Sequence, residues 1–137
     1  METKVIDTSV LIKWFIKEIK RESALKLRDS YLKGEIKLIA PDLILYEFLN
    51  ALKYIKQHNE EEMKTIFEVI MNYDIDLYLM DKELAEEAIE IAQNSELTIY
   101  DSSYLALAKL KEGKLITADE KLIKNCPKTY KKYVKGL

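Results

Sequence analysis

The stretch TKVIDTSVLI (residues 3–12) places an aspartate between two apolar segments. Its β-branched start, TKVI (residues 3–6), predicts a short strand that ends at Asp7. Apolar residues resume at Val10, which predicts a short helix over residues 9–16. A carboxylate inside such an apolar stretch costs free energy unless it is solvated, hydrogen-bonded or bound to a cation. Asp7 therefore either caps the helix or takes part in chemistry.

The same alternation of short aliphatic stretches and longer helical patterns continues along the chain. Strands are expected over residues 35–40, 75–80, 114–118 and 128–134, and helices over residues 21–34, 41–58, 60–73, 81–94, 101–113 and 119–125. Strands separated by helices predict βαβ units. We therefore expect an α/β fold in which helices flank a central, mostly parallel twisted sheet, with the lysine-rich last strand at its edge.

Composition places the chain among ordered soluble proteins. With 137 residues, 48% of them hydrophobic and 34% charged, we expect one domain over residues 1–137. The lone Cys126 suits a reducing cytoplasm, and its simplest role is that of a small buried hydrophobe. No signal peptide or apolar run of membrane-spanning length is present, so a cytoplasmic protein without a membrane partner is expected.

The charge distribution leaves two interpretations open. The net charge of −2 does not by itself indicate a nucleic-acid binder. Residues 60–90 hold eleven acids, however, whereas residues 121–137 hold six lysines and no acid. The basic end is either a local footprint for phosphates or an ordinary solvated terminus.

Three aspartates follow one local rule, and each has two interpretations. Asp7 and Asp119 each follow a predicted strand, and Asp101 opens a predicted helix. Ligands of open α/β sheets bind beyond the carboxyl ends of the strands, so Asp7 and Asp119 should lie at one edge. An aspartate before a helix is also an ordinary N-cap, and capping alone could explain each of the three.

A fourth acid, Glu47, is not explained by capping. It lies inside the predicted helix of residues 41–58, which carries apolar residues on both sides and should be largely buried. Asn50 follows one turn later and could orient Glu47 or hold a water molecule. The alternative is a solvated glutamate on an exposed strip.

If the four carboxylates converge, a hard divalent cation relieves their repulsion. Mg²⁺ prefers oxygen ligands, and Mn²⁺ accepts the same set. His58 is the only histidine and Cys126 the only thiol, which argues against zinc sites, serine triads and Cys–His nucleophiles. A carboxylate-held Mg²⁺ or Mn²⁺ is typical of phosphodiester hydrolysis, where the metal activates water and neutralises charge on the phosphate.

Four motifs resemble one known family. VIDTSVLI, PDLILYEFLNAL, YDSSYLALA and LITADEKL, in this order, are similar to the motif series of PIN-domain ribonucleases, and especially to the VapC toxins of toxin–antitoxin pairs. Asp101 and Asp119 are eighteen residues apart, with a hydroxyl at Thr117 before Asp119. The resemblance spans essentially the whole chain and implies a PIN-like three-layer sandwich.

The resemblance also implies roles for individual residues. The metal ligands and catalytic acids would be Asp7, Glu47, Asp101 and Asp119. Asp7 and Asp101 are the candidates for direct ligands, and Glu47 would bind metal or position the attacking water. Side chains that hydrogen-bond these carboxylates and fix their rotamers would be Thr8, Ser9, Asn50 and Thr117.

The implied partners are an RNA substrate, a small antitoxin protein and a second copy of the chain in a homodimer. Candidates for contacts with RNA are the C-terminal lysines together with Lys13, Lys17, Lys20 and Arg21. Three alternatives remain open at this point. They are a stand-alone PIN nuclease in RNA processing or turnover, a receiver-like signalling module, and a non-catalytic interaction protein whose acids are only caps or surface charges.

Overall fold

The structure, a computed structural model, describes residues 1–55 and 58–137. Its elements follow the expected alternation. They are β1 (Glu2–Ile6), α1 (Thr8–Leu11), the 3₁₀ helix η1 (Ile12–Trp14), α2 (Arg21–Leu32), β2 (Ile36–Pro41), α3 (Leu43–Ile55), α4 (Glu60–Tyr73), β3 (Asp76–Tyr78), α5 (Lys82–Gln93), α6 (Ile99–Leu110), β4 (Lys114–Thr117), α7 (Glu120–Asn125), the 3₁₀ helix η2 (Lys128–Tyr133) and β5 (Val134–Gly136).

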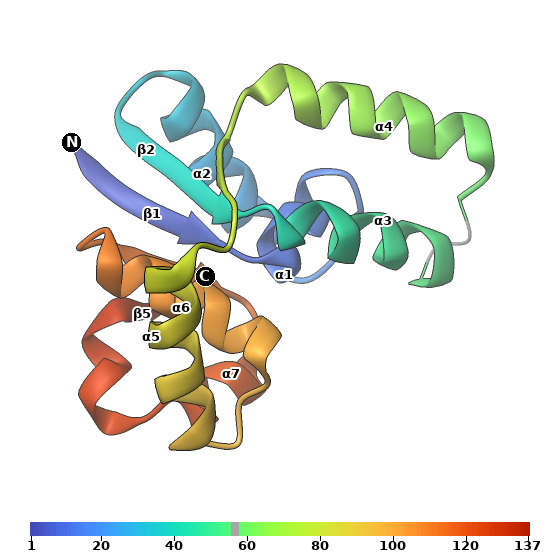
Figure 1. The fold of residues 1–137 in the computed structure, drawn as a ribbon. Coiled ribbons are helices and arrows are strands. Elements are labelled where there is room, and N and C mark those ends of the chain that lie inside the picture. The colour runs from blue at the N-terminus through green and yellow to red at the C-terminus, as the bar shows by residue number, and fades with distance from the viewer. Residues whose placement is uncertain (56–57) are drawn as a thin grey trace.

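The strands form one parallel sheet in the order β3-β2-β1-β4-β5 (Figure 1). The first strand of the chain is therefore the central one, and it pairs with β2 on one side and with β4 on the other. In the second pairing, Ile6 lies opposite Ile116. The expected α/β fold with a parallel sheet between helices is confirmed.

The strand order reverses direction at β1, and open α/β sheets have a crevice at such a reversal. The chain first builds outward from β1 to β2 and β3, and then crosses back to add β4 and β5. Right-handed crossovers place the helices of these two halves on opposite faces of the sheet. Figure 1 shows α4 on one side and α5 on the other. Ligands bind where such helices diverge, beyond the carboxyl ends of β1 and β4.

The end of the chain differs from the expected strand over residues 128–134. Residues Lys128–Tyr133 form the 3₁₀ helix η2, and only Val134–Gly136 pair with β4 as the edge strand β5. Tyr130 and Tyr133 are three residues apart, which matches the three-residue turn of a 3₁₀ helix. Tyr130 also donates a hydrogen bond to Glu87 Oε2 at 2.7 Å, and this contact holds the segment against α5.

Helix α6 begins two residues before the predicted start at Asp101. Thr98 is its N-cap, and the Thr98 hydroxyl accepts a hydrogen bond from the Asp101 backbone N–H at 3.0 Å. Asp101 therefore lies in the first turn with its carboxylate free of capping. The helix ends at Leu110, and the left-handed residue after it is Glu112, with φ 52°, instead of Gly113.

Two other helices also differ from their predicted ranges. The predicted helix of residues 9–16 is divided into α1 and η1. Helix α3 runs from Leu43 to Ile55, and residues 56–57 of the predicted range 41–58 lie outside the described residues.

The core is aliphatic and continuous, and it includes Trp14, which is 3% exposed, and Cys126. Trp14 therefore packs inside the fold. None of the helices in the described ranges is long and apolar enough to cross a membrane.

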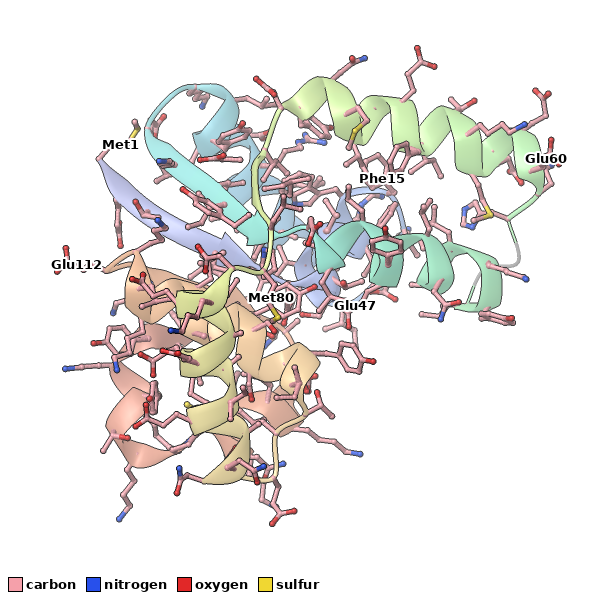
Figure 2. The ribbon with its side chains drawn as sticks, in the orientation of Figure 1. Met1, Phe15, Glu47, Glu60, Met80 and Glu112 are labelled. Atoms are coloured by element: carbon pink, nitrogen blue, oxygen red, sulfur yellow. The ribbon has the colours of Figure 1, made fainter. Side chains whose placement is uncertain are left out.

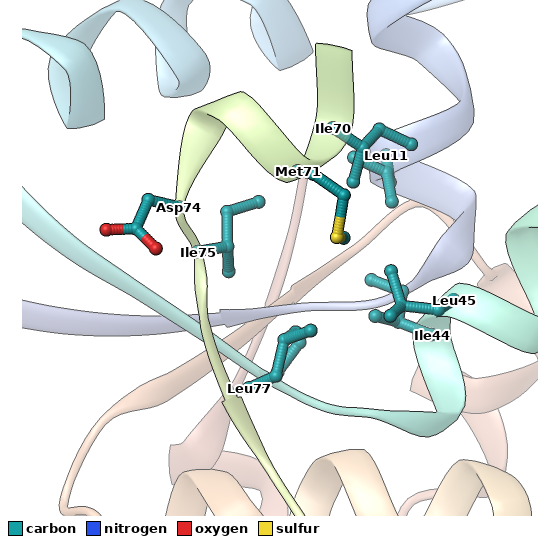
Figure 3. A pocket seen from close by; sticks show the side chains of 9 residues that line it. Leu11, Ile44, Leu45, Ile70, Met71, Asp74, Ile75 and Leu77 are labelled. Atoms are coloured by element: carbon teal, nitrogen blue, oxygen red, sulfur yellow. The ribbon is translucent and has the colours of Figure 1, made fainter. Parts of the chain in front are cut away.

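Helix α4 covers its edge of the sheet incompletely. Ile70 is the fully buried residue of this helix. A pocket of about 180 Å³ remains between α4 and the neighbouring elements, surrounded by aliphatic side chains such as Leu11, Ile44 and Leu77 (Figure 3). Asp74 stands at its rim and points away from them in the same view. This space is apolar, and it contains none of the predicted site residues.

Candidate metal centre and active site

The crevice beyond β1 and β4 holds Asp7. Its carboxylate accepts hydrogen bonds from two hydroxyls, with Ser9 Oγ on Oδ1 and Thr117 Oγ1 on Oδ2, both at 2.5 Å. The two hydroxyls are themselves fixed, because Ser9 Oγ accepts from the Ala118 N–H at 2.9 Å and Thr117 Oγ1 accepts from the Asp119 N–H at 3.0 Å. The ends of the two central strands thus hold Asp7 in one orientation.

Asp7 is also nearly out of contact with solvent, at 6% exposure. Burial raises the pKa of Asp7 to about 6, although the hydrogen bonds from Ser9 and Thr117 act in the opposite direction. The nearby charge of Asp119 raises this pKa further. The site therefore holds a negative charge that neutral hydroxyls stabilise only in part.

The capping alternative applies to one of the three aspartates. The Asp119 carboxylate accepts hydrogen bonds from the Lys121 and Leu122 N–H groups, so it caps α7 through Oδ1. Asp7 precedes α1 but makes no capping hydrogen bond with its side chain. Asp101 lies inside the first turn of α6, whose cap is Thr98. Capping therefore does not explain Asp7 or Asp101.

Glu47 is half-buried on α3 and is held by residues from two other elements. Its Oε1 accepts hydrogen bonds from Thr8 Oγ1 at 3.2 Å and from the hydroxyl of Tyr104. Tyr104 lies on α6 and is 1% exposed. Burial and the hydrogen bond to Glu47 raise the pKa of Tyr104 well above its ordinary value, so the phenol keeps its proton and donates it. One oxygen of Glu47 is thus fixed from both sides.

Asp101 completes a series of neighbouring charges. Burial raises its pKa above the ordinary value, and the charges of Asp119 and Glu47 raise it further. Asp7 feels Asp119 in the same way. Asp119 thus acts on both Asp7 and Asp101, and Glu47 acts on Asp101. In the described ranges, no three histidine, cysteine, aspartate or glutamate side chains are grouped as they would be around a bound ion.

The donor set of this crevice fits a hard divalent cation. It offers the carboxylates of Asp7 and Glu47, which hydroxyl groups hold, and the charges of Asp101 and Asp119 act on this region. Mg²⁺ and Mn²⁺ prefer such ligands. The raised pKa values of Asp7 and Asp101 reflect negative charge that a cation would relieve.

Thr8 and Asn50 were both predicted to hold a carboxylate of the site, and the structure shows such a contact for Thr8. Thr8 bonds Glu47, as a residue that fixes a carboxylate should. Asn50 is exposed and makes no hydrogen bond with Glu47 in the described part of the chain, so its role stays a prediction. The residue that the sequence analysis missed is Tyr104, because a tyrosine within YLALAKL resembles ordinary core. Its position three residues after Asp101, one helical turn away, is the signal that could have identified it.

Comparison with known proteins places these features in a family. The PIN domain family matches residues 4–127 of this chain. Ribonuclease VapC3 of Pyrobaculum aerophilum is 28% identical over 127 residues, a match that covers 90% of this chain and 94% of that relative.

Solved structures share the fold at low sequence identity. VapBC2 from Rickettsia felis, bound to a DNA fragment from its promoter, matches with a TM-score of 0.73 and 13% identity over 98% of each chain. VapC20 from Mycobacterium tuberculosis, a toxin that cleaves the sarcin–ricin loop, matches with a TM-score of 0.67 and 14% identity. That match covers 87% of this chain and 92% of the other.

Proposed function

Because this chain belongs to the PIN domain family, we propose that it is a metal-dependent endoribonuclease of the VapC type, the toxin of a toxin–antitoxin pair. Its similarity to a ribonuclease, VapC3, supports this activity. The observation that carries the proposal is the crevice beyond β1 and β4. There a buried Asp7 is fixed by hydroxyls, and Glu47, Asp101 and Asp119 lie within range of its charge or of one another's.

The metal that fits this crevice is Mg²⁺ or Mn²⁺. Asp7 and Asp101 would bind it directly, and Asp119 would complete a second, weaker site. When bound, such a cation lowers the pKa of a water molecule and neutralises charge on the scissile phosphate.

The residues of the chain prepare this chemistry before the substrate arrives. Ser9 and Thr117 lock the rotamer of Asp7. Tyr104 and Thr8 occupy Oε1 of Glu47, which leaves Oε2 to hold a ligand or to position the attacking water. Orientation of this kind lowers the activation barrier because the reacting groups need no rearrangement.

The proposed partners follow from the same family. They are an RNA substrate, a small antitoxin protein, as the VapBC2 assembly suggests, and a second copy of the chain in a homodimer. The RNA, the antitoxin and the second copy of the chain can each be tested with the purified protein.

We also propose that residues 1–137 act as a single PIN-like domain in the cytoplasm.

The lysines that could contact RNA are fewer than the sequence suggests. Lys13 is 8% exposed, and its ammonium pairs with Glu18 Oε1 at 3.1 Å. Arg21 donates hydrogen bonds to the carbonyl oxygens of Lys13 and Trp14, at 3.0 and 3.3 Å. Both cations thus stabilise the segment between α1 and α2. The predicted candidates that remain exposed are Lys17 and Lys20 and, near the C-terminus, Lys121, Lys124, Lys128, Lys131, Lys132 and Lys135.

The test is cleavage of RNA by the purified protein. Structured and single-stranded RNA are incubated with the wild-type chain and Mg²⁺ or Mn²⁺, beside the Asp101→Asn variant. We expect cleavage by the wild type, loss of cleavage in EDTA and loss in the variant. Equal cleavage by both proteins would indicate a contaminating nuclease and remove the support for a catalytic Asp101.

A further inference from the structure

Lys4 contradicts the pattern of the strand that holds it. β1 is the central strand of a parallel sheet, and such strands are normally apolar on both faces because helices cover both. Lys4 nevertheless lies in the middle of β1 and is half-buried. No carboxylate among residues 1–55 and 58–137 lies within ion-pair distance of its ammonium group. A charge that is partly buried without a partner costs free energy.

A second lysine stands beside Lys4. In the pairing of β1 with β4, Lys4 lies opposite Lys114, so both side chains point to the same face of the sheet. Like charges on neighbouring strands repel each other. Figure 2 shows Met1 and Glu112, which come shortly before these two strands, at the end of the sheet away from Glu47. The two lysines therefore form a positive region that is separate from the acidic crevice.

One face of β4 and β5 has no helix of its own in the described part of the chain. Helix α2 packs against β2 and η1, whereas α6 contacts β4 and α7 contacts β5 from the opposite face. A Cβ atom at Gly136 of β5 would lie 3.5 Å from Ile123 Cδ1 of α7. Because side chains alternate along a strand, the neighbouring Lys135 points away from α7, toward the face of the sheet that carries α2.

A pocket of about 260 Å³ lies on this face, between α2 and the strands β1, β4 and β5. Ile116, which is buried, contributes an apolar surface. The polar side chains that line the pocket are three lysines and two serines: Lys4, Lys26, Lys135, Ser23 and Ser30. No aspartate or glutamate of the described ranges lines it, and Glu22, one helical turn before Lys26, makes no ion pair with it. The pocket is therefore cationic.

We propose that this pocket binds a phosphate group, held by Lys4, Lys26 and Lys135. The inference goes beyond the proposed function, because none of the four candidate catalytic acids lines the pocket. Ammonium groups donate strong, charge-assisted hydrogen bonds to phosphate oxygens, and the serine hydroxyls are further donors. A bound anion also offsets the repulsion between Lys4 and Lys114. The phosphate group belongs either to a small polyphosphate or to the backbone of a nucleic acid strand.

An acidic peptide is the other class of ligand that lysines attract. The number of donors in one pocket favours phosphate, because a phosphate group presents three acceptor oxygens and up to two negative charges at one point. A carboxylate presents two oxygens and one charge. Three ammonium groups and two hydroxyls in a single pocket thus match a phosphate better than a carboxylate.

The experiment titrates the protein in EDTA at pH 7.5 with inorganic tripolyphosphate, with a single-stranded DNA oligonucleotide and with a hexaglutamate peptide, by calorimetry. Without metal the acidic crevice repels phosphate, so it does not contribute to binding. The variants are Lys4→Met and the double variant Lys26→Gln/Lys135→Gln, whose two sites are exposed and leave the fold intact.

The matched control is Lys53→Gln/Lys111→Gln, which removes the same charge from two exposed lysines that do not line the pocket. We expect the wild type to bind tripolyphosphate at a single site. Binding should weaken by about 10- to 100-fold in Lys26→Gln/Lys135→Gln and remain in the control, because lost charge-assisted hydrogen bonds cost this much affinity. Lys4→Met should weaken it as well, and should raise the Tm of the protein without phosphate by removing the repulsion from Lys114.

The three probes also distinguish the sources of the phosphate group. Oligonucleotide binding that depends on Lys26 and Lys135 would assign the pocket to a nucleic acid strand, and such binding of tripolyphosphate alone would assign it to a small polyphosphate. An absence of saturable binding of both phosphate probes overturns the proposal, as does an equal loss in the double variant and its control. Tighter binding of hexaglutamate than of either phosphate probe would assign the pocket to an acidic peptide instead. Because no arm requires cleavage, these results stand apart from the test of the nuclease.

Discussion

Asp7 is a carboxylate that hydroxyl groups hold almost out of solvent, and no cationic side chain among residues 1–55 and 58–137 pairs with it. Ser9 and Thr117 donate to its two oxygens, and the charge that acts on it most is the like charge of Asp119. Burial of a carboxylate under these conditions costs stability in the absence of metal. The arrangement favours binding of a cation over stability of the empty fold.

The first prediction concerns the pH dependence of this cost. The pKa of Asp7 is about 6 in the folded chain and near 3.8 in an unfolded one, so the folded state holds the proton more tightly. Protonation of Asp7 thus stabilises the folded state. This stabilisation is fully present below pH 3.8 and is lost as the pH rises through about 6. Asp7→Asn should therefore raise the free energy of unfolding of the metal-free protein at pH 8 by about 1–3 kcal/mol, and by much less at pH 4.

Urea denaturation at both pH values measures this difference. Asp81→Asn is the matched control, because Asp81 caps α5 and asparagine caps a helix equally well. A lower free energy of unfolding for Asp7→Asn at pH 8 would show that the buried charge is not the dominant cost.

The second prediction concerns Tyr104. Tyr104→Phe removes the hydroxyl that holds Glu47 and leaves the ring in the core, so metal-dependent cleavage and Mn²⁺ affinity should fall about 10- to 100-fold. Tyr130→Phe is the control, since it removes a similar tyrosine–glutamate hydrogen bond, to Glu87, outside the crevice. Equal activity of the two variants would contradict a positioning role for Tyr104.

The sequence reveals the acids of the site more readily than the residues that hydrogen-bond to them. Asp7 interrupts an apolar stretch and Glu47 lies within a buried helix, so each contradicts its local pattern. Tyr104 contradicts nothing, because an aromatic residue on an apolar helix is normal. Its role depends on α3 packing near α6, a contact between residues 57 positions apart that local patterns do not encode.

At the scale of elements, Gly113 joins α6 to β4 by close approach. A Cβ atom at this position would lie 2.5 Å from the Thr3 carbonyl oxygen of β1. Gly113→Ala should therefore lower the free energy of unfolding by about 1–3 kcal/mol, because the backbone must shift to relieve the clash.

Chemical denaturation of Gly113→Ala and Gly136→Ala tests this prediction. In the second variant the nearest atom to a new Cβ is Ile123 Cδ1, at an ordinary 3.5 Å, so little change is expected. Similar losses in both variants would point to a general effect of alanine rather than to contact with β1.

The elements themselves were predictable where hydrophobic pattern and caps agree. Helix α5 begins after Asp81, the first residue of its expected range, and Asp81 caps it by accepting a hydrogen bond from the Leu84 N–H. The cap of helix α6 is Thr98, three residues before Asp101, and both residue types cap helices well, so the sequence alone does not decide between them. In η2, alternating polar and aromatic residues resemble a strand, and the contact of Tyr130 with α5 decides for the 3₁₀ helix.

At the scale of the whole molecule, bound metal should stabilise the fold. A ligand at about 100 times its Kd adds about 2.7 kcal/mol, which raises the Tm of a chain of this size by about 5–15 °C. We expect this rise with Mn²⁺ at pH 7.5, its reversal by EDTA and its absence in Asp7→Asn. A NaCl control at matched ionic strength excludes simple screening. An equal rise in wild type and variant would place the metal elsewhere.

The strand order has a consequence for synthesis. The central strand β1 leaves the ribosome before its neighbour β4, which follows more than a hundred residues later with Thr117 and then Asp119. Chains grow at about 5–20 residues per second, and N-terminal segments emerge well before their distant partners. A nascent chain therefore carries an incomplete crevice until β4 has been synthesised, and Asp7 waits in a partly built sheet for Thr117 to supply one of its two hydroxyl donors.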